Sequence, residues 1–237
     1  SSGRYLLLPS GNMQIDNVKK SDEGQYRCIA YNPVTGQERE APNLVHLRVI
    51  APVTATSMTR FTHTEKQRVE VITGSDLTLE CVAEASPVPR VSWNTYGGQL
   101  PENRFKMFFG NLVIYEVQRH DTGTYICSAD NTLIGSTRTT VVHVDILQPP
   151  VFEREPQNQI GHVGGSVTLE CAATGYPAVT TRWLHNGKLV TPDDHISITD
   201  TTLTLTNLQA HHAGIYQCTA HNKLGKAYSH SRLQILK

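Results

Sequence analysis

Five cysteines and eleven histidines are the side chains of this 237-residue sequence with the greatest capacity for chemistry. Thiolates and imidazoles at finger-like spacing would indicate a zinc site, and a thiol beside a histidine would indicate nucleophilic catalysis. Seven of the histidines lie beyond residue 147, and their spacing matches no zinc pattern. They are His162, His185, His195, His211, His212, His221 and His230. We therefore predict no metal, no cofactor and no catalytic site, and expect that the protein is not an enzyme.

Four of the cysteines belong to two copies of one pattern: Cys81, Trp93, Tyr125 and Cys127, then Cys171, Trp183, Tyr216 and Cys218. In each copy the tryptophan follows the first cysteine by twelve residues, and the tyrosine precedes the second cysteine by two. This spacing is typical of an immunoglobulin sandwich. There the cysteines bridge the two sheets, the tryptophan packs on the bridge, and the tyrosine hydroxyl binds the backbone upstream of its strand. The pattern therefore predicts two disulfides, one within each copy.

Each predicted disulfide closes a loop of roughly fifty residues. Constraining the unfolded chain in this way contributes about 4 kcal/mol, which is a large share of a small domain's stability. Such bridges persist in oxidising compartments, so we expect an extracellular protein. The alternative is an intracellular, muscle-type immunoglobulin protein with reduced cysteines, and the two complete cysteine pairs argue against it.

A third Tyr-x-Cys motif, formed by Tyr26 and Cys28, lacks the rest of the pattern. No cysteine and no tryptophan precede it in the sequence. We therefore expect residues 1–50 to be the C-terminal half of an immunoglobulin domain whose front strands are absent. Cys28 is interpreted as a structural cysteine without its partner, and a redox-active thiol is the alternative.

Apolar and polar residues alternate in every strong segment, which indicates β-strands throughout. We predict an all-β chain of tandem I-set immunoglobulin β-sandwiches, arranged as an extended rod with short links. Residues 51–147 and residues 148–237 are the two complete domains. The pair Pro149-Pro150 marks the boundary between them, because proline cannot donate to a strand ladder.

Hairpin turns are predicted at Pro9–Asn12, at Gly110-Asn111 and at Asn186-Gly187. In the first segment, alternation predicts that Met13, Ile15 and Val18 point toward a core.

Each Tyr-x-Cys motif extends to Gly-x-Tyr-x-Cys-x-Ala-x-Asn, and an aspartate precedes it in the first two segments. Asp121 lies seventeen residues after Arg104, and Asp22 lies eighteen after Arg4. An arginine facing an aspartate across the bottom of the sandwich is usual in I-set domains. We therefore predict the ion pairs Arg104–Asp121 and Arg4–Asp22.

The third segment carries histidines at both of these positions, since His195 precedes His212 by seventeen residues. A neutral histidine pair can share a hydrogen bond, whereas two imidazolium ions repel. The pair is therefore a candidate pH-sensitive contact that acts on stability. Two solvated histidines without coupling are the alternative.

Met107, Phe108 and Phe109 are consecutive at a predicted hairpin. Alternation buries only one parity, so an exposed member would indicate a protein interface. The alternative is that the hairpin tucks under a neighbouring loop.

The formal net charge is zero, and no stretch approaches the roughly 20 apolar residues of a membrane span. We expect no nucleic-acid partner, and expect membrane attachment only through segments outside this chain. Protein partners remain as the expected ligands.

The first segment resembles one family more closely than the general I-set pattern. The carrying residues are "LPSGN" at Leu8–Asn12 and "AYNPVT" at Ala30–Thr35, with a long entry before "LTLECV". They are similar to the CDO/BOC/Ihog family of Hedgehog co-receptors. This resemblance implies a single-pass cell-surface receptor with immunoglobulin domains ahead of fibronectin type III repeats.

In that family Hedgehog binding belongs to the fibronectin repeats, and the immunoglobulin region is associated with self-association and adhesion. The resemblance therefore implies homophilic contact and protein partners at the cell surface. It assigns no Hedgehog-binding residue to this chain. A general neuronal adhesion or guidance receptor and an immunoglobulin-type receptor kinase are the alternative families.

Overall fold

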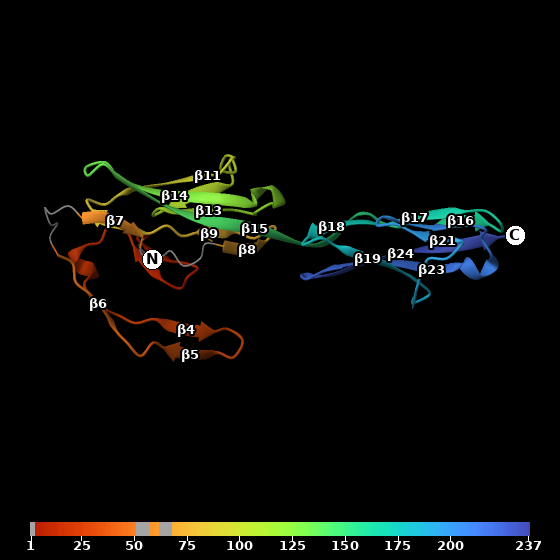
Figure 1. Cartoon of the computed structure of the whole chain (residues 1–237). Coiled ribbons are helices and arrows are strands. Elements are labelled where there is room, and N and C mark those ends of the chain that lie inside the picture. Colours follow the sequence, from red (N-terminus) through yellow and green to blue (C-terminus); the bar gives the residue numbers. More distant parts are fainter. Residues whose placement is uncertain (1–2, 51–56, 62–67) are drawn as a thin grey trace. The chain divides into compact units, whose positions relative to one another are not determined.

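The computed structural model describes residues 3–50, 57–61 and 68–237, and nearly all regular structure among them is β-strand (Figure 1). The all-β prediction is confirmed. The chain divides into two compact units, the first with residues 1–67, 78–114 and 125–142, the second with residues 68–77, 115–124 and 143–237. This division does not follow the predicted domain boundaries, which stay predictions.

The first unit begins with short strands and one 3₁₀ turn: β1 (Tyr5–Leu7), β2 (Met13–Ile15), η1 (Lys20–Asp22), β3 (Gly24–Tyr26), β4 (Ile29–Asn32), β5 (Gln37–Glu40) and β6 (Val45–Leu47). Strands β1 and β2 pair as an antiparallel hairpin, and the Pro9–Asn12 turn joins them as predicted. Gly11 has a φ of 85° there, which suits a residue without a Cβ. Strand β3 pairs with β6, and β4 pairs with β5.

Two expectations for this first segment are wrong. Met13 and Val18, predicted to point inward, are 47% and 45% exposed. The strand predicted to run through Cys28 is interrupted between β3 and β4. The equivalent strands later in the chain are continuous over nine residues, and each has a neighbouring strand on both sides. Among the described residues β3 and β4 have one neighbour each, so less pairing holds this strand straight.

The rest of the first unit contains β7 (Ser57–Phe61), β10 (Ala83–Ser86), β11 (Arg90–Thr95), β12 (Phe105–Phe108), β13 (Asn111–Ile114) and most of β9 (Leu77–Leu79) and β14 (Gly123–Asn131). Strand β11 pairs with β14, and β13 lies between β12 and β9. The β12–β13 turn is formed by Phe109 and Gly110, with φ of 48° and 84°. The predicted Gly110-Asn111 turn is therefore displaced by one residue, and Asn111 pairs with Phe108 inside the ladder.

In the second unit, β8 (Arg68–Ile72) pairs in parallel with β15 (Ser136–Arg154), and η2 (Arg119–Asp121) precedes β14. Strand β15 runs through Pro149-Pro150 and then pairs with β18 (Ala172–Tyr176). The prolines do not interrupt the strand. The pairing register shifts between Gln148 and Val151, so the prolines occupy an irregularity where no ladder donor is needed.

The end of the second unit is a two-layer sandwich. Its strands and 3₁₀ turn are β16 (Gln159–His162), β17 (Val167–Glu170), β19 (Thr180–His185), β20 (Lys188–Leu189), β21 (Ile196–Ile198), β22 (Thr202–Leu205), η3 (Ala210–His212), β23 (Gly214–Asn222) and β24 (Gly225–Leu236). One sheet has the order β16-β24-β23-β19-β20, and the facing sheet has the order β17-β22-β21 (Figure 1). The predicted Asn186-Gly187 turn is confirmed, since His185 pairs with Lys188 around it.

The core of this sandwich is built from the inward residues of both sheets: Val167, Leu169, Cys171, Trp183, Leu203, Leu205, Leu208, Tyr216, Cys218 and Leu233. Alternation along the strands explains most of the set, while Cys171 lies between β17 and β18 and Leu208 lies between β22 and η3. On β23, Tyr216, Cys218 and Ala220 are at most 1% exposed. Ile215, which has the opposite parity on the same strand, is 39% exposed. Burying one parity fixes the register, because a slip by one residue would expose the whole core.

Candidate functional site

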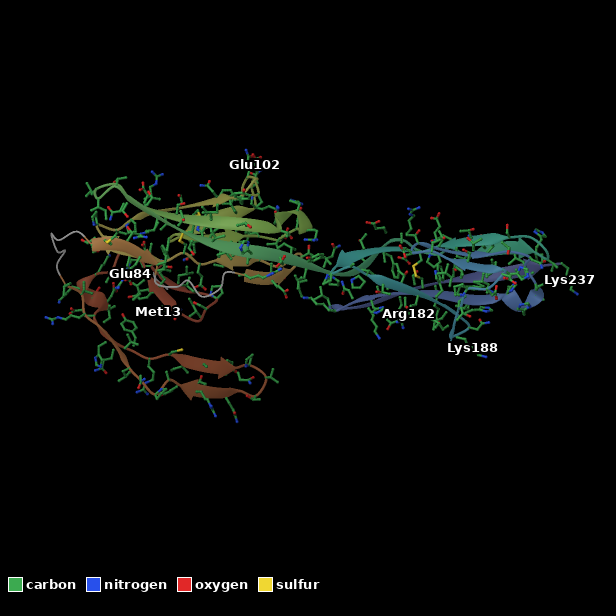
Figure 2. The ribbon with its side chains drawn as sticks, viewed as in Figure 1. Met13, Glu84, Glu102, Arg182, Lys188 and Lys237 are labelled. Carbon is green, nitrogen blue, oxygen red and sulfur yellow. A yellow bond between two sulfur atoms is a disulfide. The ribbon has the colours of Figure 1, made fainter. Side chains whose placement is uncertain are left out.

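The structure brings each predicted cysteine pair together. Cys81 is bonded to Cys127 and Cys171 to Cys218, each with Cα atoms 6.4 Å apart (Figure 2). Trp93 lies directly opposite Cys127 in the β11–β14 ladder, and its ring N–H donates to the Gly110 carbonyl at 2.8 Å. Trp183 occupies the same place opposite Cys218.

In the first and third motifs, the tyrosine binds the turn that precedes its strand. The Tyr26 hydroxyl donates to the Asp22 carbonyl at 2.6 Å, and the Tyr216 hydroxyl donates to the His212 carbonyl at 2.9 Å. Burial raises the pKa of Tyr216 to about 12. Tyr125 is 2% exposed. These residues hold the fold and offer no free chemical group.

Arg4 and Asp22 form a two-point ion pair. The two terminal guanidinium nitrogens of Arg4 each donate to a different carboxylate oxygen of Asp22 at 2.9 Å, and Asp22 is 3% exposed. The Tyr5 hydroxyl donates to the same carboxylate at 2.6 Å, and the Lys19 backbone N–H donates at 2.7 Å. The hydrogen bonds from Arg4, and then those from Tyr5 and Lys19, hold the Asp22 pKa well below its usual range.

Asp121 occupies the same place in η2. Its carboxylate accepts from the Gln118 backbone N–H at 2.7 Å, and the His120 imidazole lies 3.6 Å away. Asp121 is 6% exposed. The Arg104–Asp121 ion pair stays a prediction.

His212 takes over this capping position in η3. Its Nδ1 accepts from the Gln209 backbone N–H at 3.0 Å, and the residue is 9% exposed. An imidazole that accepts at Nδ1 is neutral, with its proton on Nε2. Burial lowers the His212 pKa, and the neighbouring His211 and His185 lower it further.

No hydrogen bond joins the rings of His195 and His212 among the described residues, and their pH-sensitive coupling stays a prediction. His195 is exposed, and its backbone carbonyl and N–H bind Thr206 and Asp193 instead. The ring closest to His212 is that of His211, with centroids 4.1 Å apart. The charge of His195 lowers the His212 pKa and is the weakest of the causes that shift it.

The predicted Arg4–Asp22 ion pair is formed, but sequence reasoning missed a second role of the aspartates of η1 and η2. Each carboxylate accepts from a backbone N–H three residues earlier, at Lys19 and Gln118, and thereby closes the 3₁₀ turn. The position of the aspartate, two residues before the glycine of Gly-x-Tyr, was the available signal. An acidic side chain at the third position of a turn commonly accepts from the N–H of the capping residue.

The β12–β13 hairpin exposes part of its apolar cluster. Met107 and Phe108 are each 41% exposed, and Phe109 is half-buried at the turn. The Phe109 carbonyl accepts from the Gln14 side chain at 2.8 Å. The cluster is small, and its turn is already bound by the Gln14 side chain, so it does not by itself indicate an interface.

Cys28 is exposed and forms no disulfide in the described part of the chain. Its backbone carbonyl accepts from Ala41 at 2.8 Å.

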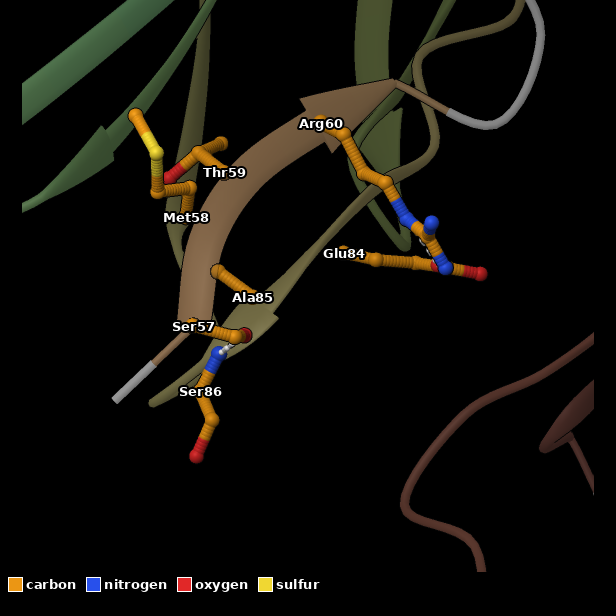
Figure 3. Close-up of a pocket in the computed structure, with 7 residues that line it drawn as sticks. All are labelled: Ser57, Met58, Thr59, Arg60, Glu84, Ala85 and Ser86. Carbon is orange, nitrogen blue, oxygen red and sulfur yellow. Dashed lines mark hydrogen bonds and ion pairs between the residues drawn. The ribbon is translucent and has the colours of Figure 1, made fainter. Parts of the chain in front are cut away.

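A hollow of about 570 Å³ lies beside β7 and β10 and is lined by Ser57, Met58, Thr59, Arg60, Glu84, Ala85 and Ser86 (Figure 3). Two contacts join groups of the lining: Arg60 lies 3.0 Å from Glu84, and the Ser86 backbone N–H donates to the Ser57 hydroxyl at 2.6 Å. The Thr59 hydroxyl is buried and has no hydrogen-bond partner among the described residues.

Across residues 3–50, 57–61 and 68–237, no group of histidine, cysteine, aspartate and glutamate is arranged to hold a metal. Within the same residues, no helix has the length and apolarity that crossing a membrane requires.

Comparison with known proteins supports the immunoglobulin assignment. An immunoglobulin I-set domain model matches residues 59–144, and an immunoglobulin domain model matches residues 149–222. Human Brother of CDO is 34% identical over 97% of this chain and 21% of its own length. Interference hedgehog of Drosophila erecta is 33% identical over 95% of this chain and 26% of its own. The chain thus spans about a quarter or less of these relatives.

Solved structures agree on the architecture. The N-terminal four Ig domains of Dscam1 isoform 7.44 match 99% of this chain and 60% of theirs, with 25% identity and a TM-score of 0.79. The insect immune protein hemolin matches all of this chain and 63% of its own, with 22% identity and a TM-score of 0.75. Hemolin, at this identity, shows the fold alone.

Proposed function

The chain belongs to the immunoglobulin superfamily and, within it, to the CDO/BOC/Ihog family, and from this we propose that it is the extracellular immunoglobulin region of an adhesion and signalling co-receptor. The observation that carries the proposal is the 34% identity to Brother of CDO across 97% of the chain. The likeness covers the early segment as well as the two disulfide-bonded parts.

The region binds other proteins and performs no catalysis. Its polar clusters serve turns and ion pairs, and its disulfides suit the oxidising surroundings of the cell surface. The whole protein crosses the plasma membrane once, through a segment outside this chain. Self-association through the immunoglobulin region follows from the family resemblance, and zero net charge leaves no long-range repulsion between copies.

Cell aggregation tests the adhesive role. Cells expressing the full-length receptor should cluster, and deletion of the region equivalent to residues 3–237 should reduce clustering at equal surface expression. Undiminished clustering would contradict the proposal. A Hedgehog-responsive reporter in the same cells tests the signalling role, where loss of the full-length receptor should weaken the response.

The human protein named cell adhesion molecule-related/down-regulated by oncogenes supports a second candidate, because it is 33% identical over 99% of this chain. On that reading the protein is a general adhesion or guidance receptor of the immunoglobulin superfamily. Intact clustering together with an unchanged Hedgehog reporter would favour this second candidate.

A further inference from the structure

The outer face of the sheet β16-β24-β23-β19-β20 combines cations with exposed apolar side chains. Arg182 on β19 and both Lys226 and Arg232 on β24 are exposed on this face. None of the five strands contains aspartate or glutamate, although residues 148–237 contain six such residues. Those are Glu153, Glu155, Glu170, Asp193, Asp194 and Asp200. A chain that is neutral as a whole therefore carries one sheet without acids.

The strand register places apolar groups between these cations. Thr219 on β23 pairs with Arg182 on one side and with Tyr228 on the other, so Tyr228 lies two strands from Arg182, at about 10 Å. Ile215 pairs with Arg232. Tyr228 is 66% exposed. Arg182 projects from the outer side of the sheet (Figure 2).

Two leucines on β19 and β20 add apolar area to the same face. Leu184 pairs with Gln217 on one side and with Leu189 of β20 on the other, and Leu189 is 61% exposed. Tyrosine and arginine are enriched at the centres of protein interfaces, where apolar area is buried and charge is matched. The face thus has the composition of an interface.

The cations of this face are not neutralised within the described part of the chain. No carboxylate lies within ion-pair distance of Arg182, Lys226 or Arg232 there. By contrast, the exposed cations Arg154, Arg60 and Arg68 pair with Glu170, Glu84 and Asp145. Unpaired cations around apolar groups complement an acidic partner.

We propose that the outer face of the sheet β16-β24-β23-β19-β20 binds a protein whose surface carries carboxylates around an apolar patch. This inference rests on the proposed protein-binding role and assigns it a surface and a partner chemistry. A sulfated polysaccharide is the weaker fit. Its recognition relies on densely placed cations, whereas Thr219, Gln217 and Ile215 separate the cations here and a polyanion gains nothing from Tyr228.

The test uses the full 237-residue chain, made multivalent and fluorescent, as a probe on cells that each display one known cell-surface ectodomain. The displayed set includes this chain itself. Variants Arg182→Glu, Arg232→Glu and Tyr228→Ala change exposed residues, so circular dichroism and melting should match the parent. The matched control is Arg138→Glu, which reverses an exposed cation on β15.

We expect at least one acidic ectodomain to bind the chain, with a tenfold or greater loss for Arg182→Glu and Arg232→Glu and no loss for Arg138→Glu. High salt should weaken binding. Equal binding by all variants overturns the proposal, as does the absence of any bound ectodomain. Loss of binding after heparinase treatment overturns it in favour of a glycan, and face-dependent binding to this chain alone overturns it in favour of a second copy.

The proposed function and this inference fail separately. If deleting the immunoglobulin region abolishes clustering but no displayed ectodomain distinguishes the parent from Arg182→Glu and Arg232→Glu, the adhesive role stands and this surface is wrong. If ectodomain binding depends on the face while clustering survives the deletion, the surface stands and the adhesive role is wrong.

Discussion

The backbone N–H of Gln209 donates to Nδ1 of His212 at 3.0 Å, in the place where a carboxylate caps the corresponding turn elsewhere in the chain. Asp22 accepts from Lys19 in the same way at 2.7 Å. A carboxylate accepts at any pH above its lowered pKa, whereas an imidazole accepts only while it is neutral. The three turns therefore share a shape and differ in their response to acid.

The first prediction concerns pH. The His212 pKa is depressed in the folded chain, so the unfolded chain binds the proton first, near a pKa of about 6.5. Stability from this cap is complete above that value and falls as pH drops through it toward the folded pKa. His212→Asp should flatten this loss. Calorimetric melting between about pH 8 and pH 5 measures the difference.

The groups facing His212 are His211, His185, His195 and the opposing Asp193. His211→Gln is the matched control, because His211 is exposed and caps no backbone N–H in the described part. It should leave most of the pH dependence in place. Parallel pH profiles for the parent and His212→Asp would refute the capping role.

The second prediction concerns Asp22. Asp22→Asn removes the charge that binds Arg4 and weakens the acceptor for the Lys19 N–H. Amide exchange across η1 should accelerate roughly tenfold as the turn opens. The exposed pair Lys20–Glu23 supplies the control, since Lys20→Ala should change exchange little. Equal exchange in both variants would show that the carboxylate is dispensable.

The acid response of this turn follows from its lowered pKa. Because the Asp22 pKa is depressed by Arg4, its contribution is present above the unfolded value near 3.9 and is lost as pH falls through the folded pKa. Exchange protection at η1 should hold at about pH 4.5, where protection of the His212 cap has already declined.

The third prediction concerns the Cys171–Cys218 disulfide. Replacing both cysteines by alanine should lower the free energy of unfolding by about 4 kcal/mol, because the bridge spans 47 residues. Calorimetry with and without reductant checks this value. Cys28→Ser is the control and should melt like the parent, since Cys28 is exposed and outside both bridges. An unchanged melting temperature in the double variant would contradict the assignment.

The fourth prediction concerns Gly214. Its φ is +149°, and an added Cβ would lie 2.5 Å from the Asn186 amide and 2.7 Å from the His185 ring. Those atoms are fixed, because Asn186 Oδ1 accepts from the Ile215 N–H at 2.9 Å. Gly214→Ala should therefore cost about 1–3 kcal/mol. Gly123→Ala at the same motif position meets nothing within 4 Å and should be nearly neutral.

Local chemistry made much of the fold predictable. The cysteine, tryptophan and tyrosine spacing located three strands in each copy, and Asn186-Gly187 located a turn, because both residues tolerate positive φ. The same rule failed at Gly110-Asn111. Phe109 takes the positive φ there, since Asn111 is fully buried and its Oδ1 binds the Cys81 N–H. A buried tertiary contact overrode the turn preference.

The candidate surface was beyond sequence reasoning. Arg182, Tyr228 and Arg232 lie on strands up to fifty residues apart, and only the register shows that they share a face. The His195–His212 pH-sensitive pair stays a prediction, since His195 lowers the His212 pKa without a hydrogen bond to its ring among the described residues. Equal spacing in sequence suggested a facing pair, but the cap at Gln209 fixes the His212 ring toward its own turn.

Strand β15 has a practical consequence for anyone who wishes to divide this protein. Its backbone pairs with β8 up to Leu147 and with β18 from Gln148 onward. Paired, extended backbone is a poor substrate for proteases, which require a locally opened segment. Division at the predicted 147/148 boundary would keep both sets of pairs, because β8 lies on the N-terminal side of the cut and β18 on the C-terminal side. Fragments should therefore be made by expressing the two parts separately rather than by proteolysis.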